Sequence, residues 1–169
     1  MRVLLLPAFV LTLAGTATAQ GAVSGVGLGY NIAKNNLVRA AEQMPEGDYS
    51  FQATKDVRTF GQLIGHVADA NFMICSTASG EANPSTTSSE KTLTTKTDLV
   101  KALKDSFTFC DKAYQLADSK AAEEVTLFGS LKTNRIGALA FNAAHDMEHY
   151  GNIVTYMRLK GMVPPSSQR

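Results

Sequence analysis

The sequence predicts an all-α protein, a four-helix bundle with a long connection between its second and third helices. Four long segments carry apolar residues at intervals of three and four, which places those residues on one side of a helix. We find no convincing pair of strands and no internal repeat. The chain has 169 residues, of which 44% are hydrophobic, and this suits one domain with one core. Together these features favour a helical bundle.

The first two helices are expected over about residues 30–44 and 54–75. Pro45 ends the first, because proline lacks an amide hydrogen and clashes with the preceding turn. Thr54 is the expected cap of the second helix, with the acidic side chain of Asp56 in its positive first turn.

The second and third helices are expected to be joined by residues 76–94, which are rich in Ser, Thr, Gly, Asn and Pro. A loop of this length inside a compact domain is uncommon, so it is either a crossover or a cover over a site. Thr95, with Asp98 three residues later, has the spacing of a capping box and begins the third helix.

The region before the last helix is ambiguous, and residues 124–131 could form a short extended piece. The fourth helix is expected over about residues 133–160, where Gly161 takes the usual C-terminal position. Pro164 and Pro165 then prevent its continuation.

The first segment has the features of a signal peptide. Arg2 gives a positive start, an apolar run follows, and Ala17-Thr18-Ala19 matches the small-x-small pattern that precedes a cut before Gln20. The alternative is a retained membrane anchor, but the run is shorter than the ~20 residues of a spanning helix. We therefore expect an exported protein, periplasmic or secreted, without membrane association after cleavage. Four parts are expected: the signal peptide 1–19, a flexible lead-in 20–29, the bundle domain 30–165 and a tail 166–169.

The charge is nearly balanced, with 16 Lys and Arg against 15 Asp and Glu. This argues against a protein whose main task is to bind phosphate backbones, so we expect no nucleic-acid partner. The two cysteines, Cys75 and Cys110, can form a disulfide if the protein is exported. The alternative is two buried thiols that never meet.

The chain contains three histidines, and their placement is informative. His145 and His149 are four residues apart on the fourth helix, so both rings leave the same face. They share a row with apolar residues, which directs them inward, and His66 lies on a mostly apolar side of the second helix. A single inward histidine is usually a core residue bonded to a carbonyl. Three such residues favour a shared metal ion, because one cation satisfies all of them.

Residues 145–149 also match H-x-x-E-H, the signature of a class of zinc proteases. Those enzymes need a carboxylate ligand far downstream, and only 20 residues follow His149, none of them Asp or Glu. This excludes the protease class. The third ligand must therefore come from upstream, where His66 is the available imidazole.

Two carboxylates are the candidates for catalytic roles. Asp69, three residues after His66, could orient a ligand or accept a proton, and its alternative is a surface salt bridge. Glu148 is the other candidate; for Glu148 and for Asp146 the default is a solvated face or support behind the ligands.

Several motifs point to one family. They are Gly65-His66 with Asp69, His145 and His149, the run His149-Tyr150-Gly151-Asn152, the run from Tyr156 to Gly161, and the segment from Tyr49 to Phe60. In these motifs the chain resembles the DinB-like superfamily over about residues 30–165. The resemblance implies a four-helix bundle, often a homodimer, with a divalent cation (zinc, nickel, manganese or iron) held by His66, His145 and His149.

The resemblance also implies an activity. Family members are described as metal-dependent hydrolases, and relatives transfer or isomerise through low-molecular-weight thiols. We therefore expect a metal-dependent hydrolase of a small-molecule substrate. The alternatives are a non-catalytic metal or small-ligand binding or stress protein of the cell envelope, a thiol-dependent transferase-like enzyme, and a metal that only joins two helices.

Overall fold

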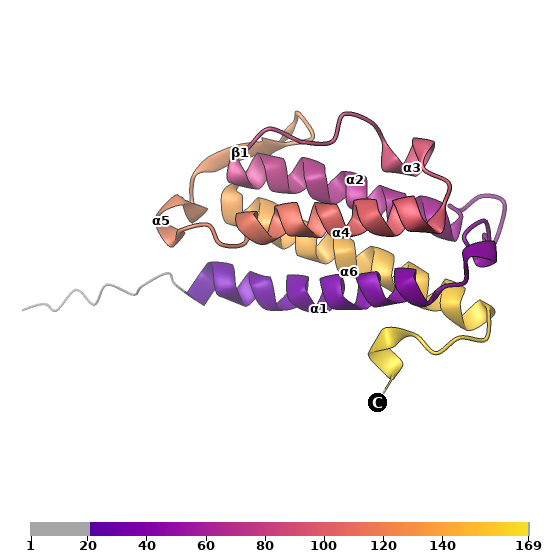
Figure 1. Ribbon diagram of the computed structural model, residues 1–169. Coiled ribbons are helices and arrows are strands. Elements are labelled where there is room, and N and C mark those ends of the chain that lie inside the picture. The colour runs from indigo at the N-terminus through magenta and orange to yellow at the C-terminus, as the bar shows by residue number, and fades with distance from the viewer. Residues whose placement is uncertain (1–20, 169) are drawn as a thin grey trace, which may run out of the picture.

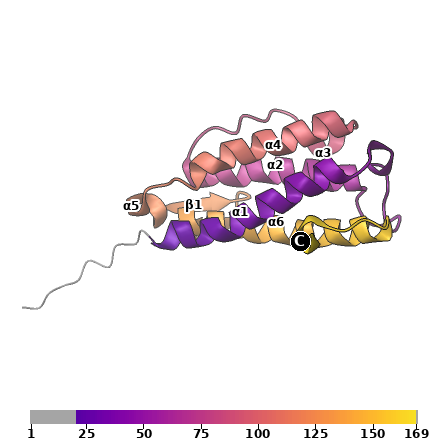
Figure 2. The same cartoon turned by 60° about the horizontal axis from the view of Figure 1, so that its bottom comes forward.

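The computed structural model describes residues 21–168, and four long helices lying side by side make up most of it (Figure 1). They are α1 (Ala22–Gln43), α2 (Phe60–Ser79), α4 (Lys96–Ala113) and α6 (Arg135–Leu159). α2 packs against both α4 and α6, whereas α1 packs against α6 and, through fewer residues, α4. The turned view in Figure 2 shows the same pairs, α4 with α2 and α1 with α6. The expected four-helix bundle is confirmed.

Shorter elements lie in the connections. They are the 3-10 helix η2 (Glu46–Asp48), α3 (Ser89–Thr92), α5 (Asp118–Ala121), β1 (Glu124–Leu127), β2 (Leu131–Asn134) and the 3-10 helix η3 (Pro165–Ser167). Across residues 21–168, every helix is too short or too polar to cross a membrane. The expected signal peptide, residues 1–19, lies outside the described residues.

The first helix begins earlier than expected. α1 starts at Ala22, so the prediction of a flexible lead-in over residues 20–29 is wrong from that residue on. Val23 and Tyr30 are buried on its inner face, and the ring of Tyr30 stacks on Tyr114 of the α4 terminus with centroids 3.8 Å apart. Glycine lowers helix propensity, but packing against neighbouring helices overrides it here.

The second helix begins later than expected, at Phe60 rather than after Thr54. Thr59 and Gln62 form a capping box, in which the Thr59 side chain accepts from the Gln62 amide and the Gln62 side chain accepts from the Thr59 amide. Asp56 therefore lies before the helix and not in its first turn. At the other end α2 reaches Ser79, and Gly80 closes it with φ of 79°, a conformation that glycine adopts freely.

The third long helix begins close to the expected position, and the fourth both begins and ends close to it. The Thr95 side chain accepts a hydrogen bond from the Asp98 amide, as the capping spacing predicted. Asn134 caps α6 by accepting from the amide of Gly137. At the other end Gly161 has φ of 73°, in the left-handed region expected after the helix.

A short antiparallel hairpin precedes α6, which corrects the expectation that the chain has no strand pair. β1 pairs with β2 so that Leu127 faces Leu131. Leu127 is buried, and this attaches the hairpin to one end of the bundle. Two strands of four residues give little alternation, which explains why the pattern did not predict them.

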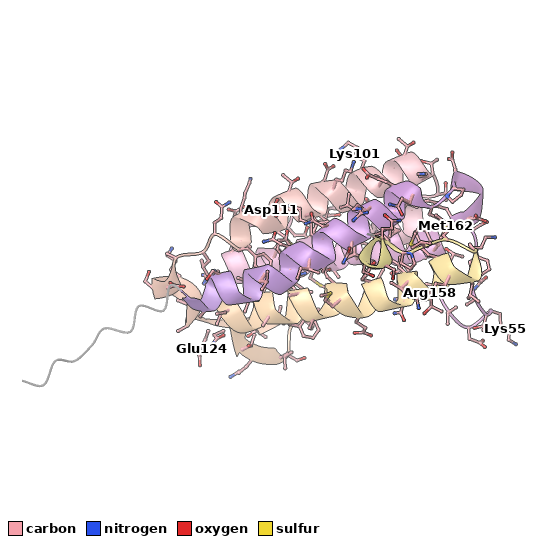
Figure 3. All side chains as sticks on the ribbon, turned by 90° about the horizontal axis from the view of Figure 1, so that it is seen from below. Lys55, Lys101, Asp111, Glu124, Arg158 and Met162 are labelled. Carbon is pink, nitrogen blue, oxygen red and sulfur yellow. A yellow bond between two sulfur atoms is a disulfide. The ribbon has the colours of Figure 1, made fainter. Side chains whose placement is uncertain are left out.

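The core lies between the four long helices. Its largest fully buried side chains are Tyr30, Leu37, Met44, Phe60, Ile64, Ile74, Leu99, Leu103, Phe107, Leu127, Leu139 and Ile153. Charged side chains such as Lys55, Lys101 and Glu124 point away from the helices (Figure 3). The inward stripes inferred from the sequence thus form one continuous interior.

A disulfide between Cys75 and Cys110 joins α2 to α4 in this core, with the two Cα atoms 5.3 Å apart. Of the two interpretations of the cysteines, the structure confirms the bridge. Beside it, Asn142 Nδ2 donates to Asn71 Oδ1 over 2.6 Å, and Asn71 Nδ2 donates to Ser106 Oγ over 3.3 Å. Bridge and hydrogen bonds together connect α2, α4 and α6, and the buried side chains of Asn71, Ser106 and Asn142 find partners in one another.

Candidate metal centre

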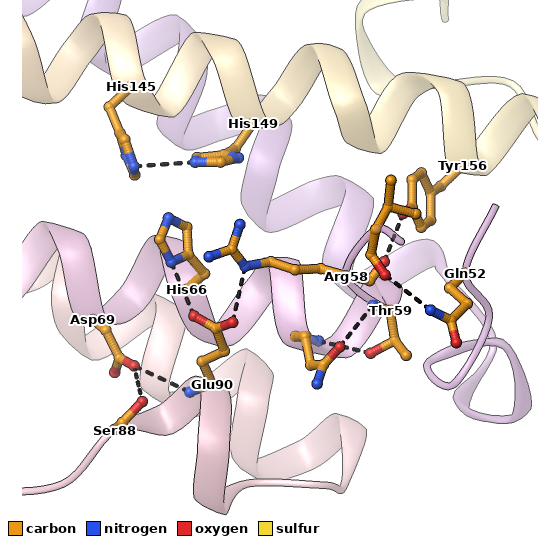
Figure 4. Close-up of polar contacts among 12 residues, drawn as sticks. Gln52, Arg58, Thr59, His66, Asp69, Ser88, Glu90, His145, His149 and Tyr156 are labelled. Atoms are coloured by element: carbon orange, nitrogen blue, oxygen red, sulfur yellow. Dashed lines mark hydrogen bonds and ion pairs between the residues drawn. The ribbon is translucent and has the colours of Figure 1, made fainter. Parts of the chain in front are cut away.

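Three imidazoles converge between α2 and α6. His66 comes from α2, and His145 and His149 come from successive turns of α6 (Figure 4). One ring nitrogen of each histidine lies within 4.8 Å of the others. The Nε2 atoms of His145 and His149 are 3.0 Å apart. The structure thus brings together the three histidines that the sequence singled out.

Glu90 fixes the direction of the His66 ring. Its Oε2 atom is 3.0 Å from His66 Nδ1, and its Oε1 atom accepts a hydrogen bond of 2.9 Å from Arg58 Nε. An imidazole that donates from Nδ1 to a carboxylate presents a lone pair at Nε2. In Figure 4 that second nitrogen of His66 faces His145 and His149. Glu90 is therefore placed as the carboxylate that orients a metal-binding histidine.

Gly65 allows the segment that carries Glu90 to lie directly on α2. A Cβ atom at position 65 would be 2.7 Å from both N and Cα of Glu90, and 2.9 Å from the carbonyl carbon of Ser89. Any other residue would push α3 away from α2, because atoms in a packed interior do not approach so closely. Glu90 could not be assigned to the site from the sequence, because it lies 24 residues after His66. The glycine before His66 was the one local signal of a close approach.

Asp69 holds α3 in place and makes no hydrogen bond to His66, His145 or His149. Its carboxylate accepts hydrogen bonds from Ser88 Oγ at 2.7 Å, from the Ser89 amide at 2.7 Å and from the Glu90 amide at 3.1 Å. In Figure 4 it points to this segment. The expectation that Asp69 itself orients a ligand or accepts a proton is thus corrected, and so is its alternative as a surface salt bridge. Asp69 affects the site indirectly, because its hydrogen bonds position the segment that carries Glu90.

His145 and His149 are uncharged at neutral pH. Burial, and after it the charges of the neighbouring imidazoles and of Arg58, lower the pKa of each ring to about 4. Their Nδ1 atoms are buried and have no hydrogen-bond partner among residues 21–168. Neutral rings present lone pairs, and imidazole binds metals in this form.

This donor set fits a divalent transition metal. Three neutral imidazole nitrogens are a familiar catalytic ligand set for Zn²⁺ and leave a coordination position open. The Nε2 atoms of His145 and His149 face each other, and a cation between the rings gives every converging lone pair a partner. The three residues present can therefore hold the ion that the resemblance implies.

A cavity of about 580 Å³ opens beside His149. Its walls are the segment before α2 (residues 55–58), the first turn of α2, Glu90 and the part of α6 from Glu148 to Tyr156. Glu148 lies on this wall next to His149, and its negative charge acts on His145. Of the two candidate catalytic carboxylates, Glu148 therefore faces the cavity.

Asp146 lies on another side of α6. It is fully buried, and neither carboxylate oxygen has a hydrogen-bond partner among the residues that the structure describes. Burial raises the pKa of this carboxyl well above its usual range, which favours the neutral acid. The carboxyl lies near the phenols of Tyr30 and Tyr114 and contributes to raising the pKa of both, so it lies on the side of α6 that faces α1 and the end of α4. The expectation of a solvated face or of support for the histidines is corrected.

Weakening the Glu90 contact should weaken metal binding. We expect Glu90→Ala to lower Zn²⁺ affinity by about 10–100-fold, because His66 loses the carboxylate that fixes its ring. Glu81→Ala is the matched control, since Glu81 is exposed in the same connection. Competition with a chromophoric chelator measures both affinities, and circular dichroism checks the fold. Equal affinities in the two variants would remove Glu90 from the site.

Comparisons with known proteins agree with the fold. The family model of the DinB superfamily matches residues 30–153. A DinB-like protein from Bacillus cereus has a TM-score of 0.73 at 17% identity, covering 84% of this chain and 95% of that one. A DinB-like protein from Bacillus subtilis has a TM-score of 0.66 at 17% identity, covering 86% and 99%.

The fold is also similar to the mycothiol-dependent maleylpyruvate isomerase, with a TM-score of 0.63 at 16% identity, covering 78% of this chain and 60% of that one. A comparison with curated sequences found no match. The family model spans well over half of the chain, and its range includes all three converging histidines. The chain belongs to the DinB superfamily.

Proposed function

We propose that this chain binds one divalent metal ion through His66, His145 and His149 and uses it to hydrolyse a small-molecule substrate. The observation that carries the proposal is the convergence of three imidazole nitrogens within 4.8 Å beside an open cavity. A divalent ion held there supplies Lewis-acid chemistry, polarising a carbonyl or phosphoryl oxygen and lowering the pKa of a coordinated water.

The residues of the chain have separate tasks in this proposal. Glu90 holds the His66 ring so that Nε2 faces its partners. Glu148, on the cavity wall, is the candidate proton acceptor. Val57, Leu63 and Tyr156 give the cavity apolar surface that excludes part of the water around a ligand.

The metal content of the purified chain tests the first half of the proposal. We expect close to one divalent ion per chain in untagged wild type and almost none in His149→Ala, because two of three nitrogen donors cannot replace the third. Met147→Ala is the control, since Met147 is exposed on the same helix between the two histidines. Elemental analysis decides: equal metal in wild type and His149→Ala, or none in wild type after reconstitution, would end the proposal.

A screen of esters, amides and lactones tests the second half. Hydrolysis by the metal-loaded chain, absent from His149→Ala, supports the hydrolase. A loaded chain that turns over none of them would favour a binding or stress protein of the cell envelope. A reaction that needs an added low-molecular-weight thiol would favour transfer or isomerisation, the type of chemistry in the name of the mycothiol-dependent neighbour.

We further propose that the chain works outside the cytoplasm, in the periplasm or secreted. The signal-peptide pattern of residues 1–19 supports this. The buried bridge between Cys75 and Cys110 supports it independently, because disulfides persist mainly in oxidising compartments.

A further inference from the structure

Arg58 places a second cation beside the candidate metal centre. It lies just before α2, where the Tyr156 hydroxyl donates to its backbone carbonyl over 2.6 Å. Its side chain extends to the space between His66 and His149 in Figure 4. Its charge acts on both His145 and His149. A guanidinium thus stands next to the place that the metal ion would occupy.

Most of the hydrogen-bonding capacity of this guanidinium is unused. Nε donates to Glu90 over 2.9 Å, and the two terminal nitrogens make no hydrogen bond within residues 21–168. The side chain keeps 42% of its surface exposed and forms part of the cavity wall. Terminal N–H groups in a fixed fork match the oxygens of a carboxylate or phosphate.

The charges around the cavity favour an anion once a metal is bound. The wall carries three carboxylates, Asp56, Glu90 and Glu148, and two cations, Lys55 and Arg58. A divalent ion changes this balance from one net negative charge to one net positive charge. The ion and the guanidinium would also repel each other at close range. Glu90 divides its charge between His66 and Arg58, so an oxygen anion between the two cations is the arrangement that satisfies both.

We infer that Arg58 and the metal ion together hold one anionic oxygen group of the ligand, so that the cavity selects small organic acids or phosphate compounds over neutral molecules of equal size. The inference rests on the proposed metal site and adds the substrate class. Arg58 supplies the fork, Glu90 and Tyr156 hold the fork in place, and Val57 and Leu63 contact the apolar part of the ligand.

Anion binding to the Co²⁺-loaded chain tests this inference without an activity assay. The visible absorption of the bound Co²⁺ ion is followed during titration with succinate, with inorganic phosphate and with neutral succinamide. We expect the tighter of the two anions to bind at least about tenfold more tightly than succinamide, since hydrogen bonds to a charged group contribute about 1.5–3 kcal/mol. The tighter anion also identifies the preferred head group.

Arg58→Gln and Lys55→Gln each remove one positive charge from the cavity wall. Comparing them distinguishes a specific role of Arg58 from a general electrostatic effect. Arg58→Gln should weaken anion binding at least about tenfold while Co²⁺ affinity is retained. Lys55→Gln removes the same charge from an exposed position on the same wall and should change anion binding by less than about threefold. Arg58→Lys should recover only part of the loss, because it keeps the charge without the fork.

The outcomes distinguish the inference from the proposed function. A wild type that takes up no Co²⁺ overturns the metal site, and the inference falls with it. A Co²⁺-loaded wild type that binds succinamide as tightly as the anions overturns the proposed role of Arg58 but leaves the metal site standing. Equal losses in Arg58→Gln and Lys55→Gln would do the same.

Discussion

Replacing His66 with alanine is expected to remove both the metal ion and every metal-dependent activity of the chain. His66 is the one ligand that α2 contributes, and two imidazoles from a single helix seldom hold an ion firmly. The loss should therefore exceed the 10–100-fold expected for removing only an orienting partner such as Glu90. Equilibrium dialysis against Zn²⁺ measures the affinity, and the hydrolase screen measures the activity.

Met73→Ala is the control for this substitution, because Met73 is exposed on the same helix.

Acid provides a second way to empty the site. The pKa of His145 and of His149 is lowered to about 4, so both rings stay neutral as the pH falls from 7. Below about pH 4 the rings of the metal-free chain take up protons, which compete with the ion, so Zn²⁺ affinity should fall steeply with further acidification. Wild-type affinity in His66→Ala would show that the metal lies elsewhere.

Reducing the bridge between Cys75 and Cys110 is expected to lower the free energy of unfolding by about 3–4 kcal/mol. The two cysteines are 35 residues apart in sequence, and the bridge restricts the unfolded chain over this whole span. Urea unfolding with and without a reductant, followed by circular dichroism at constant pH, gives the difference.

The double variant Cys75→Ala with Cys110→Ala separates the bridge from other effects of the reductant. It should show the lowered stability without reductant and no further change when reductant is added. Two free thiols in the denatured, unreduced wild type would show that the bridge is absent.

The helical segments were predictable from sequence because their stability depends on features a few residues apart. The cap at Thr95, the glycine stop at Gly161 and the apolar spacing of α6 act within one or two turns. Errors arose where distant packing prevailed. Glycine composition argued against a helix before Tyr30, yet Val23 and Tyr30 are buried against other helices and sustain it.

In the candidate site, too, the features set by local sequence were predictable and those set by distant packing were not. The spacing of His145 and His149 is a property of one helix, so the sequence alone put them on one face. Their inward direction, together with that of His66, predicted the cluster of three. The role of Asp69 was misplaced because spacing from His66 cannot reveal that Ser88 and the two following amides occupy its carboxylate.

The sequence by itself determined the bundle, several helix ends and the identity of the three converging histidines, because these follow from local periodicity, capping and the chemistry of imidazole. Only the tertiary structure decided which carboxylate orients His66, where Asp146 is buried, and which cation lies beside the centre. Glu90 and Arg58 reach the site from the connections on either side of α2. Their positions depend on how those connections fold back, which involves contacts such as the close approach at Gly65. Such contacts join residues far apart in sequence, so a local pattern can mark one partner, as Gly65 does, but cannot name the other.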